Sequence, residues 1–535
     1  MRENCLYRFR YTDLIGCGLS SNLMLFNSIE FLFIFLPAVW FGFWLLQRLG
    51  RSRLIMAWLI LASFLFYGWW NPIYLWLLAL SIGVNYGLGG ALQRWQGLVK
   101  KALLICGIAF NIGLLAYFKY GNFFVESIAV LNDVSFNFSH IVLPLAISFY
   151  TFQQITYLVD TSKGLTDSHG FLEYCLFVSF FPQLIAGPIV HHQEMLGQFK
   201  QLGAPQETSR NLGIGLSILV IGLFKKVVIA DSFGLFATPI FTMADSGVAL
   251  YTLESLAGTF SYAMQLYFDF SGYSDMAIGL ACLFGLKLPV NFYSPYRAQN
   301  ISDFWRMWHA TLSRFLRDYV YAPLGGFLCS PRRQRFNLFM TMFAGGVWHG
   351  AGWTFFLYGV FHGVYVVLHQ IWRIRVSGPL GLVGKGWYKA LAQLFTFLVV
   401  VFTLVLFRAE TVTAAADVYQ GLMNADYWGF SPHYLQVLQA TNFFAIADMV
   451  GLAGQSVILV FGSLVLAIMG CWFLPSTWQL FQPFDIALDK PPIGRAAVLS
   501  FSWQPGKVWA LFIALLFTAS CLNLTQVSEF LYFQF

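Results

Sequence analysis

Apolar runs close to the length of a membrane-spanning helix recur along almost the whole of this chain. Such a helix needs about 20 consecutive apolar residues to cross the hydrocarbon layer of a bilayer. Of the 535 residues, 58% are hydrophobic and only 10% are charged, too few charges to cover a soluble protein of this size. We therefore predict an all-α polytopic membrane protein with about 11–13 spanning or half-spanning helices.

The first part of the chain contains four apolar runs separated by links of alternating charge. We predict spans at Ile29–Leu46, Leu54–Trp70, Ile73–Leu92 and Ala102–Tyr120. The second link has no charge, whereas the first and third contain Arg48, Arg51 and Arg53, and Arg94, Lys100 and Lys101. Because positively charged loops favour the cytoplasm, we expect the first and third links inside the cell and the Met24 end outside.

Residues 1–23 differ in character from the rest of the chain. They carry three arginines but lack the apolar core and the cleavage site of a signal peptide. Met24 offers a second start directly before the first apolar run. We expect residues 1–23 to be a non-structural extension and residues 24–535 to form a single membrane domain, whose catalytic core covers roughly 141–372.

The middle of the chain departs from simple spanning helices. The apolar segment Glu173–Val190 is interrupted by Pro182 and by Gly187-Pro188, and a broken helix needs protein or a water-filled cavity around its freed backbone groups. The pair Lys225-Lys226 lies near the end of the next apolar run, where we expect it to reach a membrane interface. The segment Asn291–Gln334 is too polar to span and too aromatic to be solvated, which is typical of interfacial or re-entrant helices.

The stretch Tyr267–Gly350 gathers the polar residues that are scarce elsewhere, and an apolar chain tolerates such residues mainly where they serve function. His349 lies in the glycine-rich motif GGVWHG, and glycines allow close approach of a backbone or a substrate. An equally weighted alternative is a helix-packing glycine motif whose histidine bonds to a neighbouring carbonyl. His309 follows 40 residues earlier, and taken alone it favours an interface helix without catalysis.

Two aspartates and several arginines accompany these histidines. Asp269 and Asp275 flank FSGYS, which includes Ser274, and they are either functional or ion-paired with an arginine. Helical spacing over 304–321 divides the remaining candidates between two faces. One face carries Trp305, Trp308, His309 and Leu312, and the other Arg306, Arg314, Arg317 and Asp318.

The chemistry open to this stretch is proton transfer or acyl transfer. The sequence has no G-x-S-x-G, HExxH or phosphate-loop motif, and its eight cysteines show neither CxxC spacing nor a metal-ligand pattern. A neutral imidazole can deprotonate a hydroxyl that attacks a thioester, and a water-poor membrane cavity protects the acyl group from hydrolysis. The net charge of +7 does not indicate a nucleic-acid partner.

Long motifs of this chain resemble the membrane-bound O-acyltransferase (MBOAT) superfamily, and more narrowly its bacterial branch of alginate O-acetyltransferase membrane subunits. The matching stretches run in order from about residue 24 to the C-terminus. They include FLFYGWWNP, YFKYGNF, FPQLIAGPIV, QLYFDFSGYSDMAIGLA, NFYSPYRAQNISDFWRMWHATLSRFLRDYVYAPLGG, GGVWHGAGWTFFLYGVFHG and the terminal FLYFQF.

The resemblance implies a helical funnel with a tunnel through the membrane. His349 would be the principal catalytic residue, and His309 would assist it or line the tunnel. Tyr532, in the terminal FLYFQF, would carry the acyl group as an ester, with an aromatic interface belt as the alternative. Further tunnel-lining or substrate-binding candidates are Trp348, Trp305, Arg306, Trp308, Asp269, Ser274, Asp275 and Arg317.

The resemblance also implies a reaction and its partners. The donor would be acetyl-CoA from the cytoplasm, with no tightly bound cofactor and no metal. The acetyl group would cross a bacterial inner membrane to a periplasmic SGNH-type acetyltransferase, which places it on a polysaccharide. Alginate is the first expectation, acetylated cellulose the second and peptidoglycan the third. The rivals outside this class are a transporter or channel and a scaffold without chemistry of its own.

Overall fold

Helices account for nearly all the regular structure in the described part of the chain, as the apolar runs predict. The computed structural model describes residues 24–132, 140–166, 169–185, 187–424, 426–441, 455–488, 498–524 and Leu531. The expected extension 1–23 lies outside these residues. The buried apolar side chains form one connected core that reaches from Met24 to Leu531.

Seven helices in the described residues are long and apolar enough to cross a membrane, so the chain is a multi-pass membrane protein as predicted. They cover Ser52–Trp70, Pro72–Arg94, Gly97–Ala129, Thr208–Asp245, Trp353–Ser377, Gly386–Arg408 and Ser456–Phe473. Two shorter apolar helices cover Phe31–Gln47 and Lys507–Asn523. The four spans expected in the first part of the chain match helices with shifts of a few residues at their ends.

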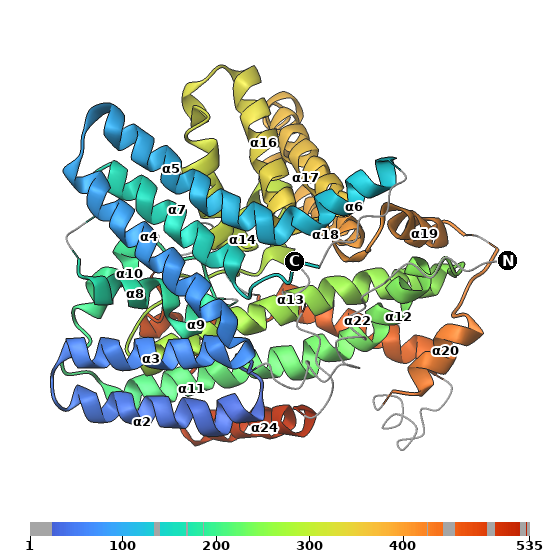
Figure 1. Cartoon of the computed structure of the whole chain (residues 1–535). Helices are drawn as coiled ribbons and strands as arrows, with labels where there is room; N and C mark the ends of the chain where they lie inside the picture. Colours follow the sequence, from blue (N-terminus) through green and yellow to red (C-terminus); the bar gives the residue numbers. More distant parts are fainter. Residues whose placement is uncertain are drawn as a thin grey trace.

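The N-terminal helices lie together at one side of the molecule, except α6, which extends from the end of α5 toward the C-terminal helices (Figure 1). They are α2 (Leu36–Gln47), α3 (Ser52–Trp70), α4 (Leu75–Arg94), α5 (Gly97–Leu115), α6 (Gly121–Asn132) and α7 (Ile147–Ser162). The segment predicted to be broken forms α8 (Phe171–Ser179) and α9 (Phe181–Leu184), with interruptions at the expected proline and Gly-Pro positions, and α10 (His192–Phe199) follows it.

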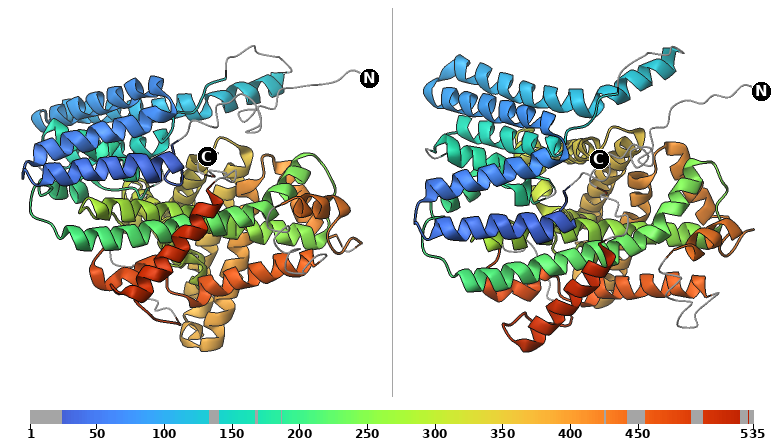
Figure 2. Two further views of the ribbon diagram at one scale, coloured as in Figure 1. Left: turned by 90° about the horizontal axis from the view of Figure 1, so that it is seen from below. Right: turned by 60° about the horizontal axis from the view of Figure 1, so that its bottom comes forward.

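Long helices cross the middle of the molecule, and the C-terminal helices pack around them (Figures 1 and 2). The central ones are α11 (Thr208–Phe224), α12 (Asp231–Asp245) and the 32-residue α13 (Thr252–Leu283). The later ones are α14 (Ile301–Met307), α15 (Ala310–Leu316), α16 (Pro331–His349), α17 (Trp353–Trp372), α18 (Gly386–Arg408), α19 (Val412–Leu422), α20 (Pro432–Gln439), α22 (Ser456–Phe473), α23 (Thr477–Phe481) and α24 (Lys507–Asn523).

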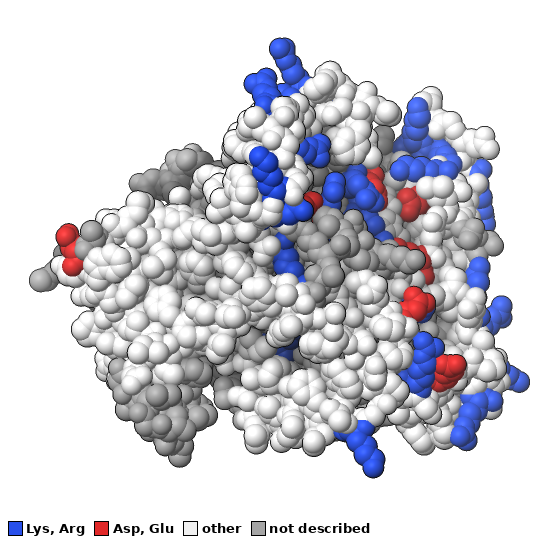
Figure 3. Space-filling model, turned by 180° about the vertical axis from the view of Figure 1, so that it is seen from behind, with Lys and Arg blue, Asp and Glu red and all other residues white. Residues whose placement is uncertain are grey.

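Positive charge gathers at one edge of the molecule. The α2–α3 and α4–α5 links lie at the same edge in Figure 1, and their arginines and Lys101 are exposed. Figure 3 shows Lys and Arg along this edge, seen from behind, and wide uncharged surfaces elsewhere. The two positively charged links therefore share a side, as their charge alternation predicts; that this side faces the cytoplasm stays a prediction.

Glycines let α11 and α13 approach each other closely. A Cβ added to Gly222 would lie 2.6 Å from the carbonyl oxygen of Gly272, and one added to Gly272 would lie 2.7 Å from that of Gly222. Gly215 and Gly279 make the same reciprocal contact one heptad away. Small residues at helix crossings are how membrane helices gain packing contacts, so α13 is held against α11 at two points.

The lysine pair expected at a membrane interface instead lies inside the protein. Lys225 and Lys226 begin a π-helical segment, Lys225–Ala230, that joins α11 to α12. The Lys226 side chain is 1% exposed and forms ion pairs with Asp231 and Asp269, both at 2.7 Å. Interior carboxylates therefore replace the water that a snorkelling lysine would reach, and the interface prediction was wrong.

The helix predicted over 304–321 is also not continuous. Helix α14 ends at Met307, Trp308 is extended, and His309 adopts the left-handed conformation with φ 43° before α15 begins. The preceding segment stabilises this break, because the Asn291 carbonyl accepts the Ala310 N–H at 3.0 Å and the Tyr293 N–H donates to the Met307 carbonyl at 2.9 Å. The two-face helical division of this stretch is therefore wrong.

The close packing of α11 on α13 predicts which glycines tolerate a methyl group. Gly222→Ala should lower the melting temperature of the purified protein, because overpacking at a backbone contact costs about 1–3 kcal/mol. Gly213→Ala, in the same helix but with open space around its Cβ, should leave the melting temperature unchanged or raise it. Equal melting temperatures for the two variants in matched detergent would contradict the glycine crossing.

Candidate active site

His349 is the last residue of α16, at the point where the chain turns to enter α17. Its side chain is 6% exposed and, within the described residues, makes no hydrogen bond. Aromatic rings surround it, with ring centroids 5.0 Å away for both Trp348 and Phe407. The glycines of its motif do serve packing, since a Cβ on Gly346 would lie 2.4 Å from the Cα of Gly359. The alternative of a histidine bonded to a neighbouring carbonyl is not what the structure contains.

His309 is fully buried at the break between α14 and α15, outside the candidate membrane spans. A non-glycine residue with positive φ costs about 1–3 kcal/mol and persists only where its surroundings enforce it, often at functional sites. The ring of Phe270, on α13, stands perpendicular to the imidazole at a centroid distance of 4.7 Å. Burial lowers the pKa of His309 below its ordinary value, which favours a neutral ring near pH 7.

The indole of Trp348 connects the two histidines. Its ring centroid lies 5.0 Å from that of His349 and 6.2 Å from that of His309. Phe152 of α7 stacks on the same indole at 5.0 Å with an interplanar angle of 18°. Two imidazoles thus meet one aromatic wall in an apolar interior, which is an arrangement suited to moving a proton without competing water.

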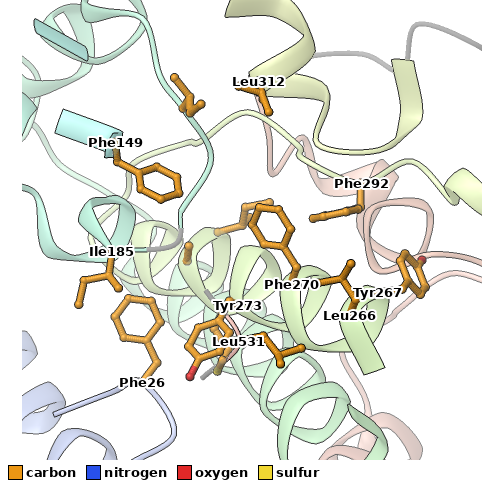
Figure 4. Packing of buried hydrophobic residues seen from close by; sticks show 14 of the residues in the cluster. Phe26, Phe149, Ile185, Leu266, Tyr267, Phe270, Tyr273, Phe292, Leu312 and Leu531 are labelled. Carbon is orange, nitrogen blue, oxygen red and sulfur yellow. The ribbon is translucent and has the colours of Figure 1, made fainter. Parts of the chain in front are cut away.

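The other predicted tryptophans lie next to this cluster and not between the histidines. Trp305 donates its indole N–H to His362 Nδ1 at 3.2 Å, so His362 is a hydrogen-bonded packing residue beside the cluster. Trp308 packs face to face on Phe304 at 5.6 Å and edge-on against Phe292 at 5.1 Å. Figure 4 shows Phe292 and Phe270 among the buried side chains of this region.

Asp269 and Asp275 form ion pairs, but with lysines and not with the arginines expected. Asp269 is 1% exposed and pairs with Lys226. The Asp275 carboxylate accepts hydrogen bonds from Lys225 Nζ at 2.6 Å and from the hydroxyl of Thr477 at 2.6 Å. These bonds join α13 to the π-helical segment and to α23, which gives both carboxylates a structural role in holding the helices.

Ser274 lies between these two aspartates on α13 and faces the histidine break. Its Oγ accepts a hydrogen bond from Asn291 Nδ2 at 3.3 Å. Asn291 in turn contacts His309, so Ser274 is linked to the imidazole through Asn291 and does not bond to it directly.

Arg306 and Arg317 lie at the surface. Their side chains are 61% and 62% exposed, and each pairs with an adjacent aspartate. The half-buried Arg314 instead makes a two-point contact with Glu194, at 2.6 and 3.1 Å. It also donates to the carbonyl of Ile189, and so it holds the extended segment after α9 against α15. Helical spacing placed Arg314 on one face with Arg306 and Arg317, but nothing in the sequence marked it as the arginine that reaches the protein interior.

Lys119 and Tyr120 were not singled out either, although they contact the end of α16 directly. Both belong to the π-helical segment Ala116–Tyr120. Lys119 Nζ lies 2.5 Å from the Trp348 carbonyl and 3.4 Å from Ser148 Oγ, and the Tyr120 hydroxyl donates to the Val347 carbonyl at 2.5 Å. The last carbonyls of a helix lack partners within the helix and attract cations, so these two residues cap α16 beside His349.

Tyr532 lies outside the described residues, so its part in the site stays a prediction. Leu531, directly before it, is 1% exposed and belongs to the same buried cluster as Tyr273 and Phe270 (Figure 4).

Comparisons with known proteins identify the family of this chain. Residues 162–405 match the family model for MBOAT, the membrane-bound O-acyltransferase family. A peptidoglycan O-acetyltransferase of Helicobacter pylori is 42% identical, over 75% of this chain and 80% of its own. A probable alginate O-acetylase of Pseudomonas aeruginosa is 34% identical, over 96% of this chain and 100% of its own. This chain belongs to the membrane-bound O-acyltransferase family.

A relative with lower sequence identity is named for the transfer of a different acyl group. A teichoic acid D-alanyltransferase of Streptococcus thermophilus is 28% identical, over 53% of this chain and 69% of its own. Family membership confirms the resemblance found in the sequence, and it makes this chain an acyltransferase enzyme. The transporter and scaffold alternatives are thereby set aside.

The cap on α16 predicts that Lys119 matters for activity. Lys119→Met should lower the rate of acyl transfer at least about tenfold, because displacing a catalytic group by about 1 Å costs up to about 100-fold. Lys101→Met, an exposed lysine on α5, should leave the rate unchanged. Rates would be measured on variants with the same melting temperature and elution volume as the wild type. A wild-type rate for Lys119→Met would exclude a role for the cap.

Proposed function

We propose that this acyltransferase moves acetyl groups from cytoplasmic acetyl-CoA across a bacterial inner membrane for O-acetylation of a cell-envelope polysaccharide. The observation that carries the proposal is the pair His349 and His309, both buried and both facing the indole of Trp348. The names of the relatives, which describe O-acetylation of alginate and of peptidoglycan, supply the acyl group and the acceptor class. The positively charged edge would face the cytoplasm and the donor.

The chemistry needs one proton shuttle and no redox partner. The acceptor hydroxyl gives its proton to the lone pair of an imidazole as its oxygen bonds to the thioester carbonyl carbon. The resulting tetrahedral intermediate collapses, the carbon–sulfur bond breaks, and the thiolate of CoA takes the proton from the imidazolium. His349 is the proposed base, and His309, which packs against the same Trp348 indole, has an assisting role. The apolar surroundings would disfavour hydrolysis of the thioester.

The first acceptor of the acetyl group in this proposal is the hydroxyl of Tyr532. An ester on Tyr532 would carry the acetyl group to a periplasmic SGNH-type acetyltransferase, which then acetylates the polymer. The buried position of Leu531 supports this step, because it places the residue before Tyr532 in the protein interior with the aromatic side chains of α13.

The test of the catalytic residues is transfer of radiolabelled acetyl from acetyl-CoA in inverted membrane vesicles. Wild-type vesicles should incorporate label, and His349→Ala should reduce incorporation about 100-fold or more, the contribution of a general base. Tyr532→Phe should abolish label bound covalently to the protein. An exposed histidine control, His140→Ala, should behave as the wild type. Normal incorporation by folded His349→Ala would contradict catalysis at this motif.

An alginate-type exopolysaccharide is the first proposed acceptor, because the alginate relative aligns over its whole length. Peptidoglycan is the specific alternative, favoured by the 42% identity of the peptidoglycan relative, and cellulose remains a further candidate. Deleting the gene should remove ester-linked acetate from one polymer only. Base-released acetate would be measured on isolated exopolysaccharide and on isolated peptidoglycan, and loss from peptidoglycan alone would overturn the alginate assignment.

A further inference from the structure

Asn291 lies in the segment that braces the chain break carrying His309. It is fully buried between α13 and α14, and no sequence pattern marked it as functional. Its backbone carbonyl accepts the Ala310 N–H, and its side chain reaches Ser274 on α13 and Thr311 on α15. The side chain is therefore fixed from three sides.

These contacts identify which atom of the Asn291 amide faces His309. The Oδ1 position receives the Thr311 backbone N–H at 3.4 Å and the Thr311 hydroxyl at 2.9 Å. That hydroxyl itself accepts the Ile189 N–H at 3.0 Å, so its proton is left to donate to Asn291. A flipped amide would place its NH₂ group against the Thr311 N–H, donor against donor, and the atom at this position is therefore the oxygen.

The same oxygen determines the tautomer of His309. His309 Nδ1 lies 3.0 Å from Asn291 Oδ1. An amide oxygen only accepts hydrogen bonds, so Nδ1 must carry the ring proton. In a neutral imidazole the lone pair then sits on Nε2, the nitrogen on the far side from Asn291.

We propose that Asn291 is a positioning residue of the acyl-transfer site, which holds His309 in the Nδ1–H form and so directs the Nε2 lone pair away from Asn291 for the assisting role of His309. The inference rests on the proposed function for the role of His309 in the reaction. The perpendicular ring of Phe270 limits rotation of the imidazole. It does not determine which imidazole nitrogen carries the proton, because the C–H groups at a ring edge are not hydrogen-bond acceptors. Only the amide oxygen makes that choice among these contacts.

The kinetic test compares two replacements of Asn291. Asn291→Leu has a similar volume but no acceptor, and it should lower kcat about 100-fold with little change in KM for acetyl-CoA. Asn291→Asp keeps an oxygen opposite Nδ1, and it should recover at least about tenfold of the lost kcat. The matched control is Asn85→Leu, since Asn85 is equally buried and bonded to Asn111 in the helices α4 and α5, away from the site. It should keep the wild-type kcat.

The spectroscopic test reads the tautomer directly. Nitrogen-15 spectra of protein labelled at histidine distinguish the protonated ring nitrogen from the bare one, and a His309→Gln variant assigns the signals. The wild type should give a bare Nε2 and a protonated Nδ1 at His309. Asn291→Leu should give a mixture of the two forms, and Asn291→Asp should restore the protonated Nδ1.

The outcomes separate this inference from the proposed function. A protonated Nε2 in the wild type overturns the tautomer assignment whatever the activity. A wild-type kcat for Asn291→Leu, together with an inactive His309→Ala, overturns the positioning role and leaves the proposed function standing. A fully active His309→Ala removes His309 from the reaction, and it overturns both the assisting role proposed for His309 and this inference.

Discussion

Each buried polar group in this molecule must find its partner inside the protein, because so little of the chain is charged and so much of its surface is apolar. Three polar side chains of helix α13, between Asp269 and Asp275, meet this constraint. Asp269 bonds to Lys226, Ser274 to Asn291, and Asp275 to Lys225 and Thr477. Leaving any of these groups unpaired in a low-dielectric interior costs several kcal/mol. The helices around α13 are therefore oriented by polar bonds as well as by close glycine contacts.

The same constraint explains how a strained histidine is tolerated. The break at His309 frees backbone groups that a continuous helix would have paired, and the segment Asn291–Tyr293 takes up bonds on both sides of it. Thr311, which bonds to Asn291, also accepts a hydrogen bond from the Ile189 N–H. Arg314 of α15 donates to the Ile189 carbonyl, so two bonds hold the segment that contains Ile189. The left-handed conformation of His309 is thus enforced by its neighbours, which is the condition for holding a side chain in one place.

The sequence predicted the class of fold, the first four spans and the shared side of the charged links, because these depend on composition and on helical length. It placed His349 and His309 in one candidate site through motifs 40 residues apart, and the structure brings both to Trp348. It did not predict the break at His309, because periodicity assumes a continuous helix, and it named the exposed Arg306 and Arg317 as site candidates but not the half-buried Arg314. Asn291 has no signature in the sequence.

Lys119 did have a signature, since a charged residue inside an apolar run is uncommon and calls for a partner. One of its partners, the Trp348 carbonyl, belongs to α16, more than 200 residues later, so the candidate site depends on helices that lie far from it in the sequence. Residues 162–405 match the family, yet Lys119, Tyr120 and Phe152 reach the site from outside that range. A chimaera that exchanges the matched region between relatives would therefore place the transplanted histidines next to Lys119, Tyr120 and Phe152 of the other protein. Acyl-group specificity would be transferable only together with the helices that precede the region.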